Sequence, residues 1–435
     1  MGKIPATEPY RRLLKRGVAE IIIEEELAKL LESGRKLRLK QGFDPSCPDI
    51  HLGHVVGLRK LRQFQELGHQ VILIVGDWTA QIGDPSGESQ TRPMLSPEEV
   101  RANAETYMKQ FFKVVAREKT RVVWQSEWFG KFNLGDVIGL ASKFTVAQML
   151  QRDDFSKRYA SGRPIAITEF LYPLLQAYDS IEIEADVEFG GTDQKFNCLV
   201  GRELQQMTGQ PPQQVFLVPL LVGTDGSMKM SKSLGNYIAI DEPPKEIYGK
   251  VMSIPDDLMM DYFELLTDVS DEELAEFRKG LENEAVNPMV LKKRLAREIV
   301  EQFHYPKAAQ DAEAEFEKVV QRREIPEHVT IVEIPISITV PHEVFQGRKM
   351  PEEIPEHRLP SIAFGEPIPL KVLESVLVEA KLVKSRGDAK RLITQRAIEI
   401  DGKRVTSDMV IIRDGSVIKV GKRRFVKIVK ADKRT

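Results

Sequence analysis

The sequence predicts an α/β protein: a doubly wound parallel sheet, then an all-helical domain, then a small α+β domain. From about residue 38 to residue 240, short apolar runs alternate with amphipathic stretches, which is typical of parallel strands joined by helical crossovers. Beyond residue 244, runs of strand length disappear until about residue 322. With 435 residues, the chain is long enough for two or three domains.

Four segments of the first domain predict individual elements. Residues 71–76 and 215–222 are continuous apolar runs of the kind found in buried parallel strands. Residues 55–67 and 169–178 have the apolar spacing of helices. Strands that alternate with helices in this way predict the doubly wound arrangement.

The helical part has a clear start signal. Asn287 followed by Pro288 predicts a helix that begins there, because Asn caps helices and Pro fits the first helical position. After this part, residues 323–369 are rich in Pro and charge. They predict a linker with one strand near residues 329–332.

The C-terminal domain is predicted to combine helices with hairpins. Residues 370–380 and 388–395 predict two helices. The Asp-Gly pairs at 401–402 and 414–415 lie between apolar alternations, and each pair predicts a hairpin.

Composition and charge exclude several classes of protein. Cys47 and Cys198 give neither a disulfide framework nor a CxxC metal site, so we expect a reduced, cytoplasmic protein without protein-bound metal. No apolar stretch suits a signal peptide or a membrane span. Residues 381–435 carry 17 Lys and Arg against 6 Asp and Glu, whereas the rest carries 46 against 59. A basic tail on an acidic body indicates a nucleic-acid partner; the alternative is a solvated charged face.

A polar segment at residues 42–54 precedes the first predicted helix. In an α/β sheet, a helix that starts at the carboxyl end of a strand offers free N–H groups to phosphate. His51 and His54 lie three positions apart on the first turn, and Gly53 lets a ligand approach the backbone. The segment therefore suits a triphosphate, with an incidental helix cap as the alternative. It shows no third metal ligand beyond Cys47.

A second polar segment, residues 223–235, follows the predicted strand at 215–222. Lys229 and Lys232 lie on this Ser- and Gly-rich loop. Their ammonium groups can approach polyphosphate oxygens as charge builds up in a transition state. An ordinary solvated loop is the alternative.

Together, the two segments resemble the signatures of class I aminoacyl-tRNA synthetases. HLGH at 51–54 is similar to the first signature, with Leu52 for the usual Ile, and KMSKS at 229–233 matches the second letter for letter. The resemblance implies the catalytic residues His51, His54, Lys229, Lys232 and Ser233. It also implies that ATP, with its Mg²⁺, is bound by Asp44, His51, Gly53, His54, Asp193, Met230 and Lys232.

Residues 172–179 resemble the motif that holds the amino acid in tyrosyl-tRNA synthetases. Tyr172, Gln176 and Asp179 fall at i, i+4 and i+7, on one face of a helix. In that family, the Tyr and Gln hold the substrate ammonium group and the Asp binds the phenol hydroxyl. The resemblance implies a tyrosine site composed of Gly42, Asp84, Tyr172, Gln176, Asp179 and Gln194.

Two positions depart from this family's pattern. Many members place a tyrosine two residues before the glycine of the Gly-Phe-Asp segment, where it contacts the phenol hydroxyl; this chain has Lys40. We expect Lys40 to pair with Asp179 in the empty site. The basic residue usual after Asp-Pro-Ser-Gly is replaced by Glu88, and Arg92 is the nearby candidate for binding pyrophosphate.

Residues 382–393, followed by Ile-Asp-Gly at 400–402, are similar to the RNA-binding fold named after ribosomal protein S-four. Basic side chains around one helix of that fold suit the phosphates of folded RNA. The resemblance implies tRNA-binding residues Lys384, Arg386, Lys390 and Arg391.

The family resemblance implies a domain plan and a function. Residues 1–245 would form a Rossmann-like catalytic domain, 246–325 a helical anticodon-binding domain, 326–369 a linker, and 370–435 an S-four-like RNA-binding domain. The chain would be a homodimeric enzyme that activates L-tyrosine with ATP and transfers it to the 3′ end of tRNA(Tyr). A tryptophanyl enzyme is one alternative, although an indole needs no Asp at position 179. A non-catalytic RNA-binding protein that keeps the fold is the other.

Overall fold

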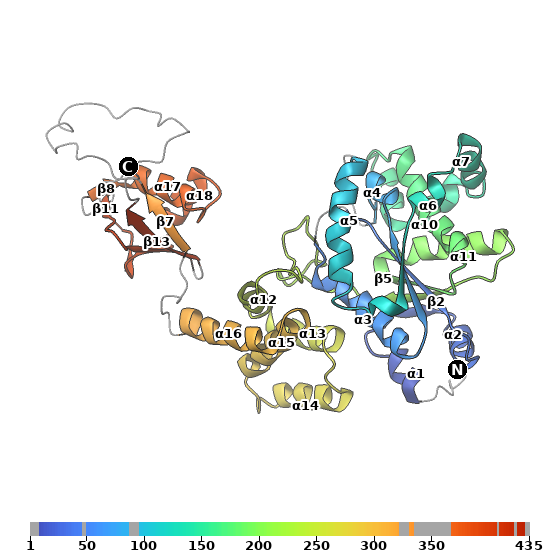
Figure 1. Cartoon of the computed structure of the whole chain (residues 1–435), viewed down its shortest axis with the longest axis horizontal. Helices are drawn as coiled ribbons and strands as arrows, with labels where there is room; N and C mark the ends of the chain where they lie inside the picture. The colour runs from blue at the N-terminus through green and yellow to red at the C-terminus, as the bar shows by residue number, and fades with distance from the viewer. Residues whose placement is uncertain are drawn as a thin grey trace. The chain divides into compact units, whose positions relative to one another are not determined.

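The computed structural model describes residues 8–45, 49–86, 95–321, 330–334, 367–406, 409–421 and 424–430 (Figure 1). The chain divides into two compact units, Met1–Glu313 and Ala314–Thr435. The predicted boundary at residue 245 falls inside the first unit, which holds both the sheet and helices α12–α15. Among the described residues, no helix is long and apolar enough to cross a bilayer.

Six strands form one sheet in the first unit, in the order β1-β6-β5-β2-β3-β4. Neighbouring strands run parallel, except that β1 is antiparallel to β6. Strand order reverses between β2 and β5, and ligands bind beside the carboxyl ends of strands at such a switch point. The bounds are β1 Glu20–Ile22, β2 Arg38–Phe43, β3 Gln70–Val75, β4 Thr120–Trp124, β5 Val187–Gly191 and β6 Gln214–Val218.

Helices cover both faces of this sheet (Figure 1). Neighbouring residues of β2 show the two faces: Lys40 reaches α10, whereas the Gln41 side chain lies beside Gly57 of α3. The helices are α1 Glu8–Leu13, α2 Glu24–Glu32, α3 Leu52–Glu66, α4 Thr79–Ile82, α5 Pro97–Phe111, α6 Ser126–Phe129, α7 Leu134–Ala141, α8 Val146–Met149, α9 Asp153–Ala160, α10 Ile167–Glu182 and α11 Lys195–Met207. Two short 3₁₀ helices are η1 Arg117–Lys119 and η2 Thr192–Gln194.

The four elements predicted in the first domain are present, with shifted ends. Strand β3 covers the run at 71–76, and its residues from Val71 onward are buried. Strand β6 ends at Val218, because Pro219 has no N–H to donate to a neighbouring strand. Helix α10 extends beyond its predicted range at both ends, whereas α3 begins three residues earlier than predicted and ends one residue earlier.

The segment after the sheet is helical, as predicted. Asn287 caps α15, and its side chain accepts the N–H of Met289 at 2.9 Å. The elements are α12 Pro244–Val251, η3 Asp256–Leu258, α13 Met259–Leu266, α14 Asp271–Glu282, α15 Pro288–Phe303, α16 Pro306–Phe316 and the π-helical η4 Glu317–Gln321.

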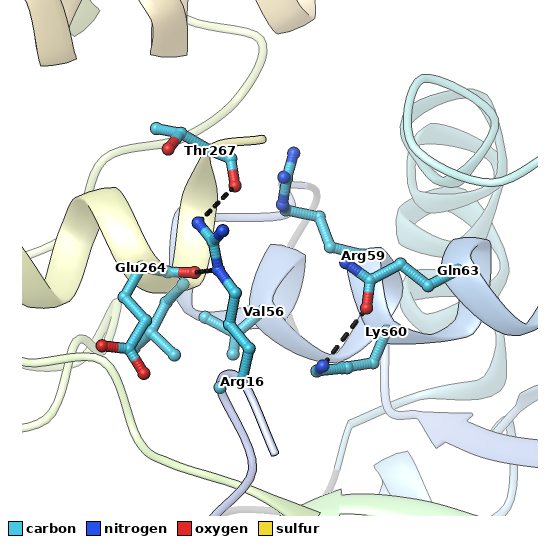
Figure 2. A pocket seen from close by; sticks show the side chains of 9 residues that line it. Arg16, Val56, Arg59, Lys60, Gln63, Glu264 and Thr267 are labelled. Atoms are coloured by element: carbon cyan, nitrogen blue, oxygen red, sulfur yellow. Dashed lines mark hydrogen bonds between the residues drawn. The ribbon is translucent and has the colours of Figure 1, made fainter. Parts of the chain in front are cut away.

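Arg16 joins the helical part to the sheet part (Figure 2). Its guanidinium donates to the carbonyl oxygens of Glu264 at 3.1 Å and Thr267 at 3.2 Å, at the end of α13. The last carbonyls of a helix have no partners within it and carry partial negative charge, so a cation stabilises them.

Lys60 of α3 lies beside Arg16 and is buried (Figure 2). Its ammonium donates to the carbonyl of Leu13 at 3.0 Å and to Gln63 Oε1 at 3.2 Å. Burial, followed by the charges of Arg16 and Arg12, lowers the pKa of Lys60 to about 7. The unfolded chain therefore binds more protons above pH 7, and this group makes the free energy of unfolding rise with pH until the ordinary lysine pKa is reached.

The second unit has a five-stranded sheet of order β10-β9-β12-β13-β7 and a two-stranded sheet of β11 and β8. Buried apolar residues of the two helices and the strands form its core. Both predicted helices are confirmed. The elements are β7 Thr330–Ile334, β8 Pro367–Pro369, α17 Leu370–Glu379, α18 Arg386–Thr394, β9 Ile398–Ile400, β10 Lys403–Arg404, β11 Met409–Ile411, β12 Val417–Val420 and β13 Arg424–Lys430.

Strand pairing in the second unit confirms one predicted hairpin and corrects the other. Strands β9 and β10 pair around Asp401 and Gly402, both of which have the positive φ that such a tight turn needs. Strand β11 pairs with β8 instead of β12, because both edges of β12 are taken by β9 and β13. The strand expected near 329–332 is β7, which pairs in parallel with β13, so the predicted linker 326–369 supplies a strand to this sheet.

Candidate active site

A cavity of about 670 Å³ opens beside the carboxyl ends of β2, β3 and β5. This volume is ordinary for a small-molecule site. The lining includes every residue predicted to be catalytic or to bind ATP or tyrosine: Gly42, Asp44, His51, Gly53, His54, Asp84, Tyr172, Gln176, Asp179, Asp193, Gln194, Lys229, Met230, Lys232 and Ser233.

His51 and His54 form the first turn of α3. His51 Nδ1 accepts the N–H of Gly53, and His54 Nδ1 accepts the N–H of His51, both at 3.2 Å. Burial and then neighbouring positive charge lower the pKa of both rings, that of His54 to about 3. Both rings are therefore neutral at pH 7, and because Nδ1 accepts, the proton is on Nε2. Each ring can donate from Nε2 to a ligand oxygen.

Backbone pairing joins the two signature segments. The N–H of Leu52 donates to the carbonyl of Ile238, and the N–H of Ile240 donates to that of Ile50, each at 3.0 Å. The chain directly after the KMSKS loop is thus fixed against the start of α3.

Asn236 fastens the loop at residues 223–235 from its C-terminal side. Its Oδ1 accepts the N–H of Ser231 at 2.8 Å, and its Nδ2 donates to the carbonyl of Lys229 at 3.1 Å. Gly223 leaves room for this amide, since a Cβ there would lie 2.3 Å from Asn236 Nδ2. Asn236 therefore positions the backbone that carries both lysines.

The two lysines reach opposite walls of the cavity. Lys229 Nζ lies 2.7 Å from Asp193 Oδ2, just beyond β5. Lys232 Nζ donates to the hydroxyl of Tyr107 on α5 at 3.3 Å and lies 5.1 Å from the centre of that ring. Both contacts are of the kind that an anionic ligand can replace.

Asp84 lies at the other end of the cavity. Its Oδ2 accepts from Gln194 Nε2 at 2.7 Å, and its Oδ1 accepts the N–H of Ser86 at 2.8 Å. The buried guanidinium of Arg152 lies 3.8 Å from Oδ1. These contacts hold the Asp84 carboxylate in place, where it can attract a substrate ammonium group.

Asn197 of α11 links three of these side chains. Its Oδ1 accepts from Arg152 Nη1 at 3.1 Å. Its Nδ2 donates to Gln176 Oε1 and to Gln194 Oε1, also at 3.1 Å each. Since a guanidinium can only donate, Arg152 decides which end of the Asn197 amide faces the two glutamines.

Asp179 is buried beneath the cavity. Its Oδ2 accepts from Gln125 Nε2 at 2.8 Å, and its Oδ1 accepts from the indole of Trp128 at 3.2 Å. Burial raises the pKa of Asp179 to about 8, although the charge of Lys40 and these hydrogen bonds oppose the shift. Asp179 is thus one of the few polar groups that the pocket holds in a fixed orientation, as recognition of one hydroxyl requires.

The expected pairing of Lys40 with Asp179 is wrong. Lys40 Nζ lies 2.8 Å from Glu188 Oε1. Lys40 and Glu188 are register partners on the adjacent strands β2 and β5, so their side chains emerge side by side on one face of the sheet. Asp179 is on α10, and Gln125 and Trp128 occupy its carboxyl oxygens.

Tyr172, which is predicted to hold tyrosine, contacts Asp44, which is predicted to bind ATP. Its hydroxyl donates to Asp44 Oδ2 at 2.8 Å, and Asp44 Oδ1 accepts from Thr79 Oγ1 at 2.7 Å. Burial, followed by the charge of Asp44, raises the pKa of Tyr172 well above its usual value, so the hydroxyl keeps its proton and acts as a donor.

Sequence reasoning missed several residues that the structure places around the cavity. Gln125 directly follows β4, so the position of ligands at carboxyl strand ends would have indicated it, had β4 been predicted. The others lie on helices, strands or loops without a local pattern, and most of their partners come from distant segments. The missed residues are Thr79, Tyr107, Gln125, Trp128, Arg152, Glu188, Asn197 and Asn236.

The second unit carries the four predicted tRNA-binding residues around one helix start. Ser385 caps α18 by accepting the N–H of Asp388 at 3.2 Å, and Arg391 lies 3.2 Å from the Asp388 carboxylate. All four basic side chains are exposed, so the structure brings together Lys384, Arg386, Lys390 and Arg391.

Metal ligands do not cluster in the part of the chain that the structure describes, where no group of three His, Cys, Asp or Glu side chains could hold an ion. Cys47, Glu88 and Arg92, which the sequence analysis considered, lie outside the described residues.

Comparisons with known proteins identify the family of this chain. A profile of the family described as tRNA synthetases class I (W and Y) matches residues 32–321, and an S4 domain profile matches residues 373–418. A tyrosine–tRNA ligase of Dehalococcoides mccartyi is 58% identical over 418 residues, which are 96% of this chain and 98% of the relative. The tyrosine–tRNA ligase of Thermotoga maritima is 47% identical, with 97% of each chain covered.

Solved structures agree as well. Tyrosyl-tRNA synthetase of Archaeoglobus fulgidus, complexed with L-tyrosine, has a TM-score of 0.57 and 25% identity over 69% of this chain and 98% of that one. A C-terminally truncated mitochondrial tyrosyl-tRNA synthetase of Aspergillus nidulans shares the fold, with a TM-score of 0.60 and 21% identity over 73% of this chain and 94% of that one. Since the profile covers most of the chain and the relatives span nearly all of it, the chain belongs to the tyrosine–tRNA ligase family of class I tRNA synthetases.

Proposed function

We propose that the chain activates L-tyrosine with ATP to tyrosyl-adenylate and pyrophosphate, and then transfers tyrosine to the 3′ end of tRNA(Tyr) in the cytoplasm. One observation carries this proposal: residues of the HLGH segment at 51–54 and of the KMSKS segment at 229–233 line the same cavity as Tyr172, Gln176 and Asp179 of α10. The family described above supports it.

The first step needs positioning and charge rather than a general base. The tyrosine carboxylate, already ionised at neutral pH, attacks the α-phosphorus; a carboxylate oxygen–phosphorus bond forms, and the bond from the α-phosphorus to the bridging oxygen breaks. The electron pair leaves with pyrophosphate. His51 and His54 donate from Nε2 to phosphate oxygens, and Lys229 and Lys232 balance the growing negative charge. Mg²⁺ enters with the ATP phosphates as part of the substrate.

For this step, the lysines exchange their partners. Lys229 leaves Asp193, and Lys232 leaves the Tyr107 hydroxyl, when phosphate oxygens become available. Asp193 is then free to accept from the ATP ribose, and Asp44, Gly53 and Met230 complete the nucleotide side. Ser233, whose Oγ lies 2.7 Å from Ser231 Oγ, adds a hydroxyl to the same loop.

Tyrosine lies in the other half of the cavity. Asp84, Gln176 and Tyr172 surround its ammonium group, while Gly42 and Gln194 line the walls. The phenol hydroxyl meets the Asp179 carboxyl group at the buried end. A tryptophanyl enzyme has no hydroxyl to place there, so the buried polar group at position 179 favours tyrosine.

Replacing Lys232 tests the chemistry. Because Lys232 meets the phosphates chiefly in the transition state, we expect Lys232→Ala to raise the barrier to adenylate formation by roughly 2–4 kcal/mol, with little change in tyrosine affinity. Tyrosine-dependent pyrophosphate exchange and single-turnover adenylate formation measure this. The control is Lys109→Ala, an exposed lysine on α5. An unchanged rate constant would remove Lys232 from the mechanism, and no exchange by the parent chain would favour a non-catalytic RNA-binding protein.

Replacing Asp179 tests amino-acid specificity. A site that hydrogen-bonds a substrate hydroxyl rejects the analogue without it by about 10⁴–10⁵, a value measured on tyrosyl enzymes themselves and adopted from them. We expect Asp179→Ala to lose most of this discrimination. The measured quantity is the ratio of kcat/KM for tyrosine to kcat/KM for phenylalanine in pyrophosphate exchange. The exposed Asp257→Ala is the control. If Asp179→Ala keeps the parent ratio, the hydroxyl is recognised elsewhere.

Removing the second unit tests tRNA binding. Since β7 belongs to the C-terminal sheet, the truncation should end at residue 321 and not within the predicted linker. We expect this chain to make tyrosyl-adenylate at the parent rate but to lose most tRNA charging. Charging assays at increasing salt should also show a steep loss of tRNA affinity for the full chain. Equal charging by both chains would mean that the basic tail binds another partner.

Exposed apolar side chains support a homodimer. Leu134 and Ile138 on α7 are 73% and 60% exposed, and Val146, Tyr159 and Ile167 on the following helices are 61%, 69% and 82% exposed. If they form one contiguous patch, it is of the kind that another subunit covers. We expect sedimentation equilibrium to give twice the chain mass of 49.4 kDa, and Ile167→Asp to shift the protein toward the monomer. Val290→Asp, at a similarly exposed residue of α15, should stay dimeric. A monomeric parent would contradict the proposal.

A further inference from the structure

Lys40 and Glu188 form a fully buried ion pair beneath the cavity. Their side chains are 0% and 2% exposed, and Lys40 Nζ lies 2.8 Å from Glu188 Oε1. The ammonium also donates to the carbonyl of Gln176 at 2.6 Å and to Ser180 Oγ at 2.7 Å. All three of its N–H groups thus have acceptors, two of them on α10.

Glu188 uses both carboxylate oxygens as acceptors. Oε1 accepts from Gln176 Nε2 at 3.0 Å as well as from Lys40. Oε2 accepts from Gln213 Nε2, which also donates to the carbonyl of Cys198 at 3.3 Å. A carboxylate that is paired with a cation offers no proton, so Gln176 must turn its NH₂ group toward Glu188.

The orientation of the Gln176 amide follows from this contact. With Nε2 toward Glu188, its Oε1 accepts from Asn197 Nδ2 at 3.1 Å, and Gln176 is one of the residues that line the cavity. An amide oxygen has a second lone pair for a substrate ammonium group. The reversed amide would present N–H groups to that cation and repel it.

We infer that Lys40 and Glu188 are positioning residues, which fix the Gln176 amide so that its oxygen accepts from the ammonium group of the amino-acid substrate. This inference rests on the proposed function, because it assigns Gln176 to the substrate ammonium. Lys40 does not touch the substrate; it supplies the positive charge that keeps a buried carboxylate an acceptor.

The cost of burying two charges supports a role beyond packing. Buried ion pairs can often be replaced by apolar or neutral residues of similar size without loss of stability. α11 also leaves space for this cluster at Gly201, where a Cβ would lie 2.7 Å from Gln213 Nε2 and 3.2 Å from Glu188 Oε2. The pair therefore determines a direction of hydrogen bonding that an apolar pair could not.

The test removes the Lys40–Glu188 pair and measures the KM for tyrosine and the KM for ATP separately. The full chain with Lys40→Met and Glu188→Gln together has no unpaired buried charge, and the isosteric Glu188→Gln is measured alongside it. In Glu188→Gln alone, Lys40 can only donate and keeps the new amide oxygen on the side that Gln176 Nε2 contacts, so this variant is a control and should keep the parent KM for tyrosine. In the double variant no cation holds the new amide, and its NH₂ group can face Gln176, which that residue can meet only with its oxygen. In pyrophosphate exchange, we expect the double variant to raise the KM for tyrosine about ten- to a hundredfold, while kcat and the KM for ATP stay within about twofold of the parent.

A matched control and a double-mutant cycle separate positioning from general damage. Arg38→Met removes a cation from the same strand, where it pairs with Glu184 at 2.6 Å away from the cavity, and should leave the KM for tyrosine unchanged. In a Gln176→Ala background, removal of the pair should add nothing further, because its effect passes through that amide.

Three results would decide against the inference. They are a parent-like KM for tyrosine in the double variant, equal losses in kcat and in the KM for ATP, and an effect of the same size in the Gln176→Ala background. Absence of tyrosine-dependent exchange in the parent chain would instead overturn the proposed function.

Discussion

The amino-acid half of the site depends on the buried contact between Lys40 and Glu188, which joins strands β2 and β5. Strand order reverses between β2 and β5, and these two residues face each other across that boundary. Side chains from α10 and from the segment before β6 meet the pair there. Since buried polar groups must be satisfied, one cation at this place constrains the direction of every hydrogen bond around it.

The two halves of the cavity use different interactions: fixed hydrogen bonds in the amino-acid half, and cations with replaceable partners in the nucleotide half. In the amino-acid half, Asn197 and Gln176 form a series of hydrogen bonds between two charged ends. Arg152 at one end, and Glu188 paired with Lys40 at the other, determine which atom of each amide donates and which accepts. The nucleotide half consists of neutral imidazoles held by the backbone of α3 and of lysines that contact replaceable partners. A preorganised pocket suits discrimination between similar amino acids, whereas exchangeable cations suit charge that appears during the reaction.

The sequence was most informative where local chemistry decides the structure. The apolar run of β3, the Asn287 cap and the Asp401-Gly402 turn each depend on neighbouring residues, and each was predicted. The hairpin predicted at Asp414 and Gly415 is wrong, because an alternating run does not identify its partner strand. Lys40 was assigned the wrong carboxylate for a similar reason: its partner depends on which strand lies beside β2, and a crossover of more than a hundred residues separates the two.

The contact between Trp128 and Asp179 places one of the fluorescent side chains of the protein beside the cavity. The chain has three tryptophans, Trp78, Trp124 and Trp128, and all of them lie in the first unit. Trp78 packs against Phe129 with ring centres 6.1 Å apart, and the indole of Trp128 donates to Asp179, whose pKa is raised to about 8 by burial. Intrinsic tryptophan fluorescence of this protein therefore originates in the first unit, with Trp128 in contact with the cavity residue Asp179, and the basic C-terminal unit contributes none to it.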